Sequence, residues 1–288
     1  MTTSRSAKSG RQPPMLVATP DGPRVVVHEW GNPRGPELLL IHGVAQSHLC
    51  FERQFTSELA REHRIVAYDV RGHGCSDKPL GAEHYTDGKR WADEVGAVID
   101  AKALRRPVLV GWSLGGRIAA QYLLHHGDER LSGVNFVASR VIPDKRYSGP
   151  ASLALPQADP RDLAGHVAMA TVFLRACYHR QPEEKDFGRQ LAYNMLAPIE
   201  VRTAIRAWPA DLAKTNAALE AMRVPVLITH GRQDAIVLPE VAELAARLIP
   251  RSRLSWYDDC GHSPFWEDTP RFNRELAGFV AEVWKPAA

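Results

Sequence analysis

A run of apolar residues that ends in a glycine-bracketed serine constrains this sequence more than any other feature. Residues 107–116 read Pro-Val-Leu-Val-Gly-Trp-Ser-Leu-Gly-Gly, and a helix-forming segment follows them. Because glycine has no Cβ, Gly111, Gly115 and Gly116 allow a sharp turn at which a strand and a helix approach closely. Such a turn exposes the hydroxyl of Ser113, where a histidine can activate it as a nucleophile. Gly-x-Ser-x-Gly also occurs by chance, so the pattern alone fits a turn with a solvated serine equally well.

A second apolar run ends in a turn that suits the stabilisation of negative charge. Residues 37–41 lead into His42-Gly43, and the backbone N–H of Val44 follows. Paired with the N–H of Leu114, which directly follows the serine, it would form an oxyanion hole. We therefore predict Val44 and Leu114 as the two oxyanion donors.

Two later runs precede an acid and a base. Residues 225–231, Pro-Val-Leu-Ile-Thr-His-Gly, come shortly before Asp234, and residues 252–257 lead through Asp-Asp-Cys-Gly to His262. A serine, then an aspartate past a buried strand, then a histidine on the last loop is the order found in hydrolases with a catalytic triad. We predict Ser113 as nucleophile, Asp234 as acid and His262 as base.

Other titratable residues near these turns fit the roles less well. Asp258 and Asp259 are rival acids because they lie close to the predicted base in sequence, but Asp234 stands at the end of an apolar run. His42 and His73 are more typical of buried, hydrogen-bonded histidines than of proton carriers.

Taken together, these motifs resemble those of the α/β-hydrolase superfamily, and the resemblance extends from about Met15 to the C-terminus. The motifs are His42-Gly43, Asp69-Val-Arg-Gly-His-Gly-Cys-Ser76, the Gly-Trp-Ser-Leu-Gly-Gly turn, Gly231-Arg-Gln-Asp234 and Gly261-His-Ser-Pro-Phe-Trp-Glu267. The resemblance implies the serine-nucleophile branch with a helical cap, which includes esterases, lactonases and haloperoxidase-like enzymes. It also implies that residues 69–76 form a structural turn without a catalytic role.

The alternation of short apolar runs with helix-period segments predicts an α/β fold, with an eight-stranded, mostly parallel, doubly wound sheet. Ligands of such sheets bind beyond the C-terminal ends of the strands, where the predicted triad falls. Strands are expected at 15–18, 25–30, 38–41, 65–68, 108–110, 134–137, 226–229 and 254–257. Helices are expected at 50–61, 90–104, 114–126, 240–248 and 270–284.

The expected domain organisation is a tail, a core in two pieces and an insertion. Residues 1–14 are polar and basic without an apolar stretch, which predicts a disordered tail rather than a secretory signal. The core spans 15–139 and 222–288. Residues 140–221 contain helical patterns but no convincing strand, which predicts an inserted cap. Its helices are expected at 163–178, 185–196 and 199–208.

Aromatic residues supply the candidates for substrate contact. Trp112 and Phe265 flank the predicted catalytic residues, whereas Phe173 and Trp208 belong to the predicted cap, together with Tyr178 and Met195. Aromatic side chains at helical spacing more often pack within a core than contact a ligand. Trp112 and Phe265 are therefore the stronger candidates for the pocket wall.

Composition excludes several function classes. A net charge of +3, from 36 basic and 33 acidic residues without a Lys/Arg tract, argues against nucleic acid as a partner. No apolar run reaches membrane-spanning length. The four cysteines show no metal-binding spacing, which predicts reduced thiols in a cytoplasmic protein without structural zinc. No phosphate-cradling loop or ligand cluster implies a metal or an organic cofactor.

The function expected first is hydrolysis of a carboxylic ester or lactone, a small-molecule substrate, through an acyl-enzyme on Ser113. Three alternatives stay open, namely a carbon–carbon bond hydrolase of vinylogous diketones, a cofactor-free oxygenase or perhydrolase-like enzyme, and a ligand receptor on the same fold. Serine at position 113, rather than aspartate, argues against haloalkane dehalogenase and epoxide hydrolase chemistry. The sequence leaves open whether the chain forms a homo-oligomer.

Overall fold

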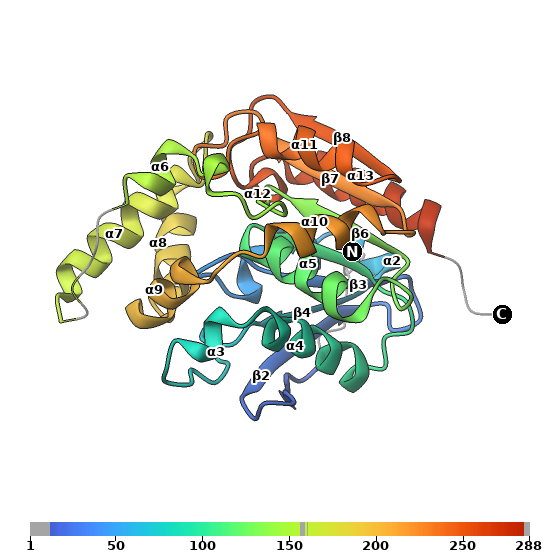
Figure 1. Cartoon of the computed structure of the whole chain (residues 1–288), viewed down its shortest axis with the longest axis horizontal. Helices are drawn as coiled ribbons and strands as arrows, with labels where there is room; N and C mark the ends of the chain where they lie inside the picture. Colours follow the sequence, from blue (N-terminus) through green and yellow to red (C-terminus); the bar gives the residue numbers. More distant parts are fainter. Residues whose placement is uncertain (1–11, 156–158, 160, 285–288) are drawn as a thin grey trace, which may run out of the picture.

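One sheet of eight strands lies at the centre of the described chain (Figure 1). The computed structural model describes residues 12–155, 159 and 161–284. The strands are β1 (Met15–Ala18), β2 (Arg24–Gly31), β3 (Glu37–Ile41), β4 (Arg64–Asp69), β5 (Val108–Trp112), β6 (Gly133–Val137), β7 (Val226–Gly231) and β8 (Ser252–Tyr257). Their order is β1-β2-β4-β3-β5-β6-β7-β8. Only the pairs β1–β2 and β2–β4 are antiparallel, so the predicted α/β fold with a mostly parallel, eight-stranded sheet is confirmed.

The inner strands are apolar because both of their faces are covered. Every residue of β3, β5, β6 and β7 is buried. Since these strands are parallel, their C-terminal ends meet at one edge of the sheet, and Ile41 there pairs with Gly111. The turns that carry the predicted catalytic residues all begin at this edge.

Helices cover both faces of the sheet. On one face α5 (Leu114–His126) packs on β3, β5 and β6, with α4 (Gly88–Ala101) and α10 (Leu212–Glu220) beside it and α11 (Glu240–Leu248) on β7 and β8. On the other face α1 (Glu52–Phe55), α12 (Pro264–Glu267) and α13 (Thr269–Val283) pack on one another, and α2 (Leu59–Glu62) packs on β2. The predicted helices 114–126 and 240–248 have the bounds that the structure shows.

The single helix predicted at 50–61 is wrong. The segment forms a 3-10 turn, η1 (His48–Phe51), and then the two short helices α1 and α2. Two hydroxyl side chains interrupt the helix. Thr56 donates to the carbonyl of Glu52, and Ser57 donates to the carbonyl of Gln54 while accepting from the N–H of Leu59. Such local bonds give the backbone an alternative to helical hydrogen bonds, so the apolar period continues while the helix does not.

Four helices between β6 and β7 form a group at one side of the sheet. They are α6 (Pro150–Leu153), α7 (Leu163–Ala176), α8 (Glu184–Asn194) and α9 (Ile199–Ala207), which lie at the left of Figure 1. The last three correspond to the helices expected in the insertion. The next helix, α10, was not expected as a separate helix and packs on α5 of the core. Two shorter elements are α3 (Glu83–Thr86), which contacts α9, and η2 (Lys145–Tyr147).

Three further expectations concern the termini, membranes and thiols. Most of the expected disordered tail, residues 1–11, lies outside the described residues, whereas the N–H of Gln12 donates to the carbonyl of Glu29 at 3.0 Å. Among the described helices, none is both long and apolar enough to span a membrane. All four cysteines are free thiols, and Cys75 alone is exposed.

Candidate active site

Ser113 occupies a strained turn between β5 and α5. Its backbone has φ 54° and ψ −113°, a conformation that side-chain-bearing residues rarely adopt. Hydrogen bonds hold it there, because its N–H donates to the carbonyl of Val137 at 3.0 Å and its carbonyl accepts from the hydroxyl of Ser139 at 2.7 Å. The turn predicted from the glycine pattern is therefore fixed by the neighbouring strand β6.

Glycine is required on both sides of this turn. A Cβ on Gly115 would lie 2.1 Å from the carbonyl oxygen of Ile41, so α5 can approach β3 only without a side chain at this position. A Cβ on Gly43 would lie 3.3 Å from the Cβ of Ser113, so the turn after β3 lies directly beside the serine. The two turns predicted to carry oxyanion donors are thus neighbours in space.

Both predicted oxyanion donors have an uncommitted N–H within the described part of the chain. The N–H of Leu114 belongs to the first turn of α5, where backbone donors have no partner inside the helix and the helix dipole favours negative charge. The N–H of Val44 lies in the turn after β3. That turn is braced by His42, which lies 2.8 Å from the carbonyl of Gly43 through Nδ1 and accepts from the N–H of Val70 through Nε2 at 3.0 Å.

The bracing histidine is fully buried. Burial lowers the pKa of His42 to about 4, so its imidazole is neutral near pH 7. With one ring nitrogen donating and the other accepting, both are already used in the scaffold. A proton-carrying role for His42 would break the turn that presents Val44.

Asp234 and His262 are brought together by the loops that follow β7 and β8. The Nδ1 of His262 lies 2.7 Å from Oδ2 of Asp234, and both residues are buried. The other carboxylate oxygen accepts the N–H groups of Ile236 and Val237 at 2.8 and 2.9 Å. Burial by itself would raise the pKa of Asp234, but attraction to His262 and hydrogen bonds from His230 and His262 lower it well below its usual range. The carboxylate is therefore ionised and oriented towards the imidazole.

The base also lies next to the residue that precedes the serine. Nε1 of Trp112 donates to the backbone carbonyl of His262 at 2.8 Å, and the two rings are 5.8 Å apart. Nε2 of His262, the atom that would accept the proton of Ser113, is buried and makes no hydrogen bond to any described residue. Catalytic hydrogen bonds often form only once substrate binds, so a free Nε2 is compatible with its accepting a proton.

The two rival acids do not contact the base. Asp258 is exposed and pairs with Arg232 at 2.9 Å, and Asp259 is exposed as well. Of the three aspartates considered from sequence, only Asp234 is hydrogen-bonded to His262. Its position directly past a buried strand is what distinguishes it.

Comparison with known proteins identifies the family of this chain. A family profile described as alpha/beta hydrolase fold matches residues 36–269. The chain belongs to the α/β-hydrolase family. A putative aryl esterase from Burkholderia cenocepacia has a similar structure, with a TM-score of 0.88 and 38% identity over 94% of this chain and 99% of that one.

Two further relatives differ in activity. The esterase RhEst1 from Rhodococcus sp. ECU1013 has a TM-score of 0.86 and is 30% identical over 95% of this α/β-hydrolase and all of its own chain. A 2-hydroxymuconate semialdehyde hydrolase from Pseudomonas sp. (strain CF600) is 28% identical over 280 residues, which are 91% of this chain and 92% of the relative. The family is thus established, while its members act on different substrates.

The aromatic candidates of this α/β-hydrolase fall into two groups. Trp112 and Phe265 are buried beside the base, with ring centroids 4.8 Å apart in an edge-to-face arrangement. Trp208 instead follows α9, with the guanidinium of Arg117 3.7 Å above its ring and Trp91 stacked at 5.7 Å. Phe173 is buried in α7. Of these four residues, Trp112 contacts His262 directly, and Phe265 packs on Trp112.

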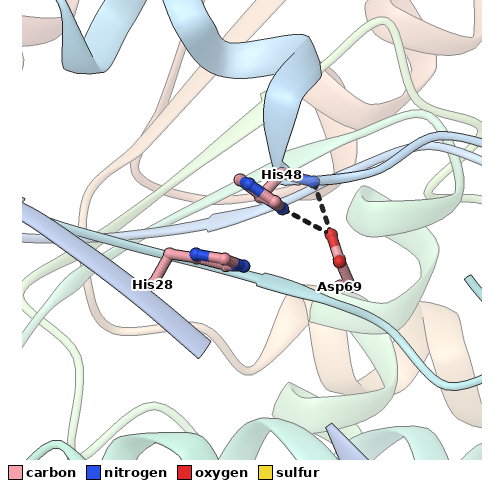
Figure 2. Close-up of side chains that lie close together, drawn as sticks. All are labelled: His28, His48 and Asp69. Carbon is pink, nitrogen blue, oxygen red and sulfur yellow. Dashed lines mark hydrogen bonds and ion pairs between the residues drawn. The ribbon is translucent and has the colours of Figure 1, made fainter. Parts of the chain in front are cut away.

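One buried group near the site has the residue types of a metal centre. His28, His48 and Asp69 offer ligand atoms within 4.8 Å of one another (Figure 2). The backbone N–H and Nδ1 of His48 both lie 2.8 Å from one oxygen of Asp69, whose other oxygen accepts the N–H of Cys75 at 2.9 Å.

The geometry of this group does not suit a cation. The rings of His28 and His48 are stacked, with centroids 3.6 Å apart and planes at 22°. Because imidazole lone pairs lie in the ring plane, two nearly parallel stacked rings do not direct them at one point. The hydrogen bonds to Asp69 instead fix the turn after β4, which matches the structural role that the resemblance implied for residues 69–76.

Two functional neighbours were missed from sequence. Ser139 supports the carbonyl of Ser113, and His230 contacts the carboxylate of Asp234 at 3.1 Å. Both are polar residues at or just beyond the C-terminal ends of buried strands. That position marks them as candidates, but their partners depend on which strands are neighbours.

Proposed function

We propose that this α/β-hydrolase cleaves carboxylic esters, lactones included, through an acyl-enzyme on Ser113. The observation that carries the proposal is the buried pairing of His262 with ionised Asp234. The carbonyl of His262 accepts a hydrogen bond from Trp112, the residue before the strained serine. A carboxylate holding an imidazole in this way is what a serine nucleophile needs in order to lose its proton near neutral pH. Similarity to two esterases at 30% identity or more points to the same chemistry.

In the proposed mechanism, Nε2 of His262 accepts the proton as Oγ of Ser113 attacks the ester carbonyl. The developing oxyanion is held by the N–H groups of Val44 and Leu114, which have no competing acceptor among the described residues. Asp234 stabilises the imidazolium, which then gives its proton to the departing alcohol. A water molecule activated by the same histidine releases the acid and regenerates the serine.

The helices α6–α9 fit the role of a cap over this chemistry. Arg117, one turn after the serine, donates to the carbonyls of Trp208 and Pro209 at 3.0 Å and so joins the end of α9 to α5. The backbone N–H groups of His179 and Arg180 donate to Glu267, a residue of α12. A cap attached at both points would exclude water from a modest, partly apolar substrate resting near Trp112 and Phe265.

A fluorophosphonate probe tests the nucleophile directly. Mass spectrometry should place the adduct on Ser113, and Ser113→Ala should lower the hydrolysis of p-nitrophenyl butyrate by roughly 10⁴- to 10⁶-fold. Ser132→Ala is the matched control, because Ser132 bonds to Arg106 at the opposite end of the sheet and should keep both labelling and turnover. Labelling on any other residue would exclude Ser113 as the nucleophile.

A carbon–carbon bond hydrolase is the second candidate, favoured by the similarity to a 2-hydroxymuconate semialdehyde hydrolase. Both reactions use a serine, a histidine and an aspartate around a carbonyl group, so the proposed site suits either. A coloured ring-fission diketone separates them. Bleaching at a higher kcat/KM than that of any ester would favour this second reaction, and an unchanged spectrum would favour ester hydrolysis.

A further inference from the structure

We infer that His230 is a positioning residue for the proposed base, because its Nε2 lies within hydrogen-bond distance of the same oxygen of Asp234 that His262 binds. The inference rests on the proposed function, because it takes His262 as the base that Asp234 stabilises. It adds a fourth side chain to the three that the sequence predicted.

The contacts of His230 determine where its proton lies. His230 is the second-last residue of β7 and is 1% exposed. Its Nε2 lies 3.1 Å from Oδ2 of Asp234 and 3.2 Å from the carbonyl oxygen of Val237. Both neighbours are acceptors, so Nε2 must carry the hydrogen and donate.

The other ring nitrogen indicates a neutral imidazole. Nδ1 of His230 is buried and finds no hydrogen-bond partner among the described residues. A second proton there would be a buried donor without an acceptor, which is costly. The edge-to-face contact with Trp256, at 6.1 Å between centroids, also holds the ring in this orientation. His230 is thus a fixed, uncharged donor.

A neutral donor near Oδ2 reduces the electrostatic stabilisation that the carboxylate of Asp234 gives to protonated His262. Oδ1 of Asp234 is already occupied by two backbone N–H groups, and Oδ2 serves both His230 and His262. Sharing this oxygen lowers the negative charge that His262 meets. The imidazolium of His262 is therefore stabilised less than it would be by a carboxylate without the second histidine.

Other titratable side chains also lie near the Asp234–His262 pair, and substitution of His230 leaves them in place. Cys177 and Glu267 are the other titratable side chains near it, and burial raises the pKa of both, most of all for Cys177. The carboxylate of Glu267 accepts the N–H of Gly261 at 2.8 Å on the loop of the base. On the adjacent strand β8, Trp256 pairs with His230, and the charged Arg253 pairs with Leu227, three residues earlier in β7.

Two substitutions separate donation from packing. His230→Leu removes the donor while keeping apolar bulk, and His230→Gln keeps an N–H donor of similar reach. We expect His230→Leu to move the acidic limb of the kcat/KM profile upward by about one pH unit, since a hydrogen bond to a charged acceptor is worth about that much. We also expect KM to stay constant in both variants and His230→Gln to restore the limb.

A second measurement does not depend on turnover. In the ¹⁵N-labelled wild-type protein, imidazole spectra should show His230 protonated at Nε2 and bare at Nδ1, with His230→Gln identifying its signals. A proton on Nδ1 at neutral pH would overturn the inference. An identical acidic limb in wild type and His230→Leu would also overturn it, because a purely structural histidine changes stability without moving that limb.

Failure of the inference can be distinguished from failure of the proposed function. Wild-type protein that neither hydrolyses esters nor reacts at Ser113 would refute the proposed function, and the tautomer would still be measurable. Active wild type with an unmoved limb in His230→Leu would refute the inference alone. If His230→Leu fails to fold, the inference is tested by the tautomer of His230 in the wild type and by the acidic limb of the kcat/KM profile of His230→Gln.

Discussion

At the scale of single residues, two buried histidines link the stability of this fold to pH. Burial lowers the pKa of His42 to about 4 and that of His73 to about 3, against 6.5 for an ordinary histidine. As pH falls below 6.5 the unfolded chain takes up these protons before the folded chain does. The stability they confer is therefore complete above pH 6.5 and is lost as pH falls towards 4, by about 1.4 kcal/mol per pH unit for each histidine.

Urea unfolding between pH 7 and 4.5 measures this slope. His73 lies 2.9 Å from the carbonyl of Arg71 through Nδ1, a contact that an asparagine amide can replace, so His73→Asn should reduce the slope by about half. A free energy of unfolding that stays constant from pH 7 to 5 would contradict the assignment of neutral, buried histidines.

The candidate catalytic residues could be predicted from sequence because each follows an apolar run. Ser113, Asp234 and His262 stand just past β5, β7 and β8, and parallel strands bring such positions to one edge. Ser139 and His230 could not be assigned in the same way. Their contacts depend on which strands are neighbours and on the direction of each side chain, and neither is encoded in a local pattern.

At the scale of elements, the close approach of α5 to β3 depends on Gly115. Gly115→Ala would place a methyl group 2.1 Å from the carbonyl of Ile41, so the helix or the strand must shift. We expect a loss of about 3 kcal/mol or more in the free energy of unfolding, together with most of the proposed ester hydrolysis. Gly278→Ala in α13 is the control, because a Cβ there meets nothing within 4 Å and should stabilise the helix by about 0.5–1 kcal/mol. Similar urea midpoints for the two variants would show that the helix can move away.

Element types were predictable where apolar period and turn chemistry agree, as in α5 and α11. The predicted helix at 50–61 was wrong because Thr56 and Ser57 use their hydroxyls on nearby backbone groups, which hydrophobic periodicity does not register. Strands β5 and β7 each end two residues later than predicted, so Trp112 and His230 lie within them. In the structure those residues continue the ladder and reach the site.

At the scale of the whole molecule, an ion cluster around a buried arginine joins three segments far apart in sequence. The guanidinium of Arg71, with a fully buried side chain, binds Glu94 of α4 at 2.7 Å and Asp21, in the turn between β1 and β2, at 2.7 and 2.9 Å. Burial raises the pKa of Glu94, and Arg71 opposes this shift. The cluster therefore holds the first hairpin and α4 on the turn after β4.

Arg71→Met leaves the carboxylate of Glu94 buried without its cation. Removing one partner of a buried ion pair costs about 3–5 kcal/mol, whereas removing both is often close to neutral. We therefore expect a large fall in the urea midpoint for Arg71→Met and recovery of most of it in Arg71→Met/Glu94→Gln. Arg253→Met, which breaks the exposed pair with Glu282, should leave the midpoint nearly unchanged because water screens that pair. If the double variant were no more stable than Arg71→Met, the loss would come from the packing of Arg71 rather than from the stranded charge.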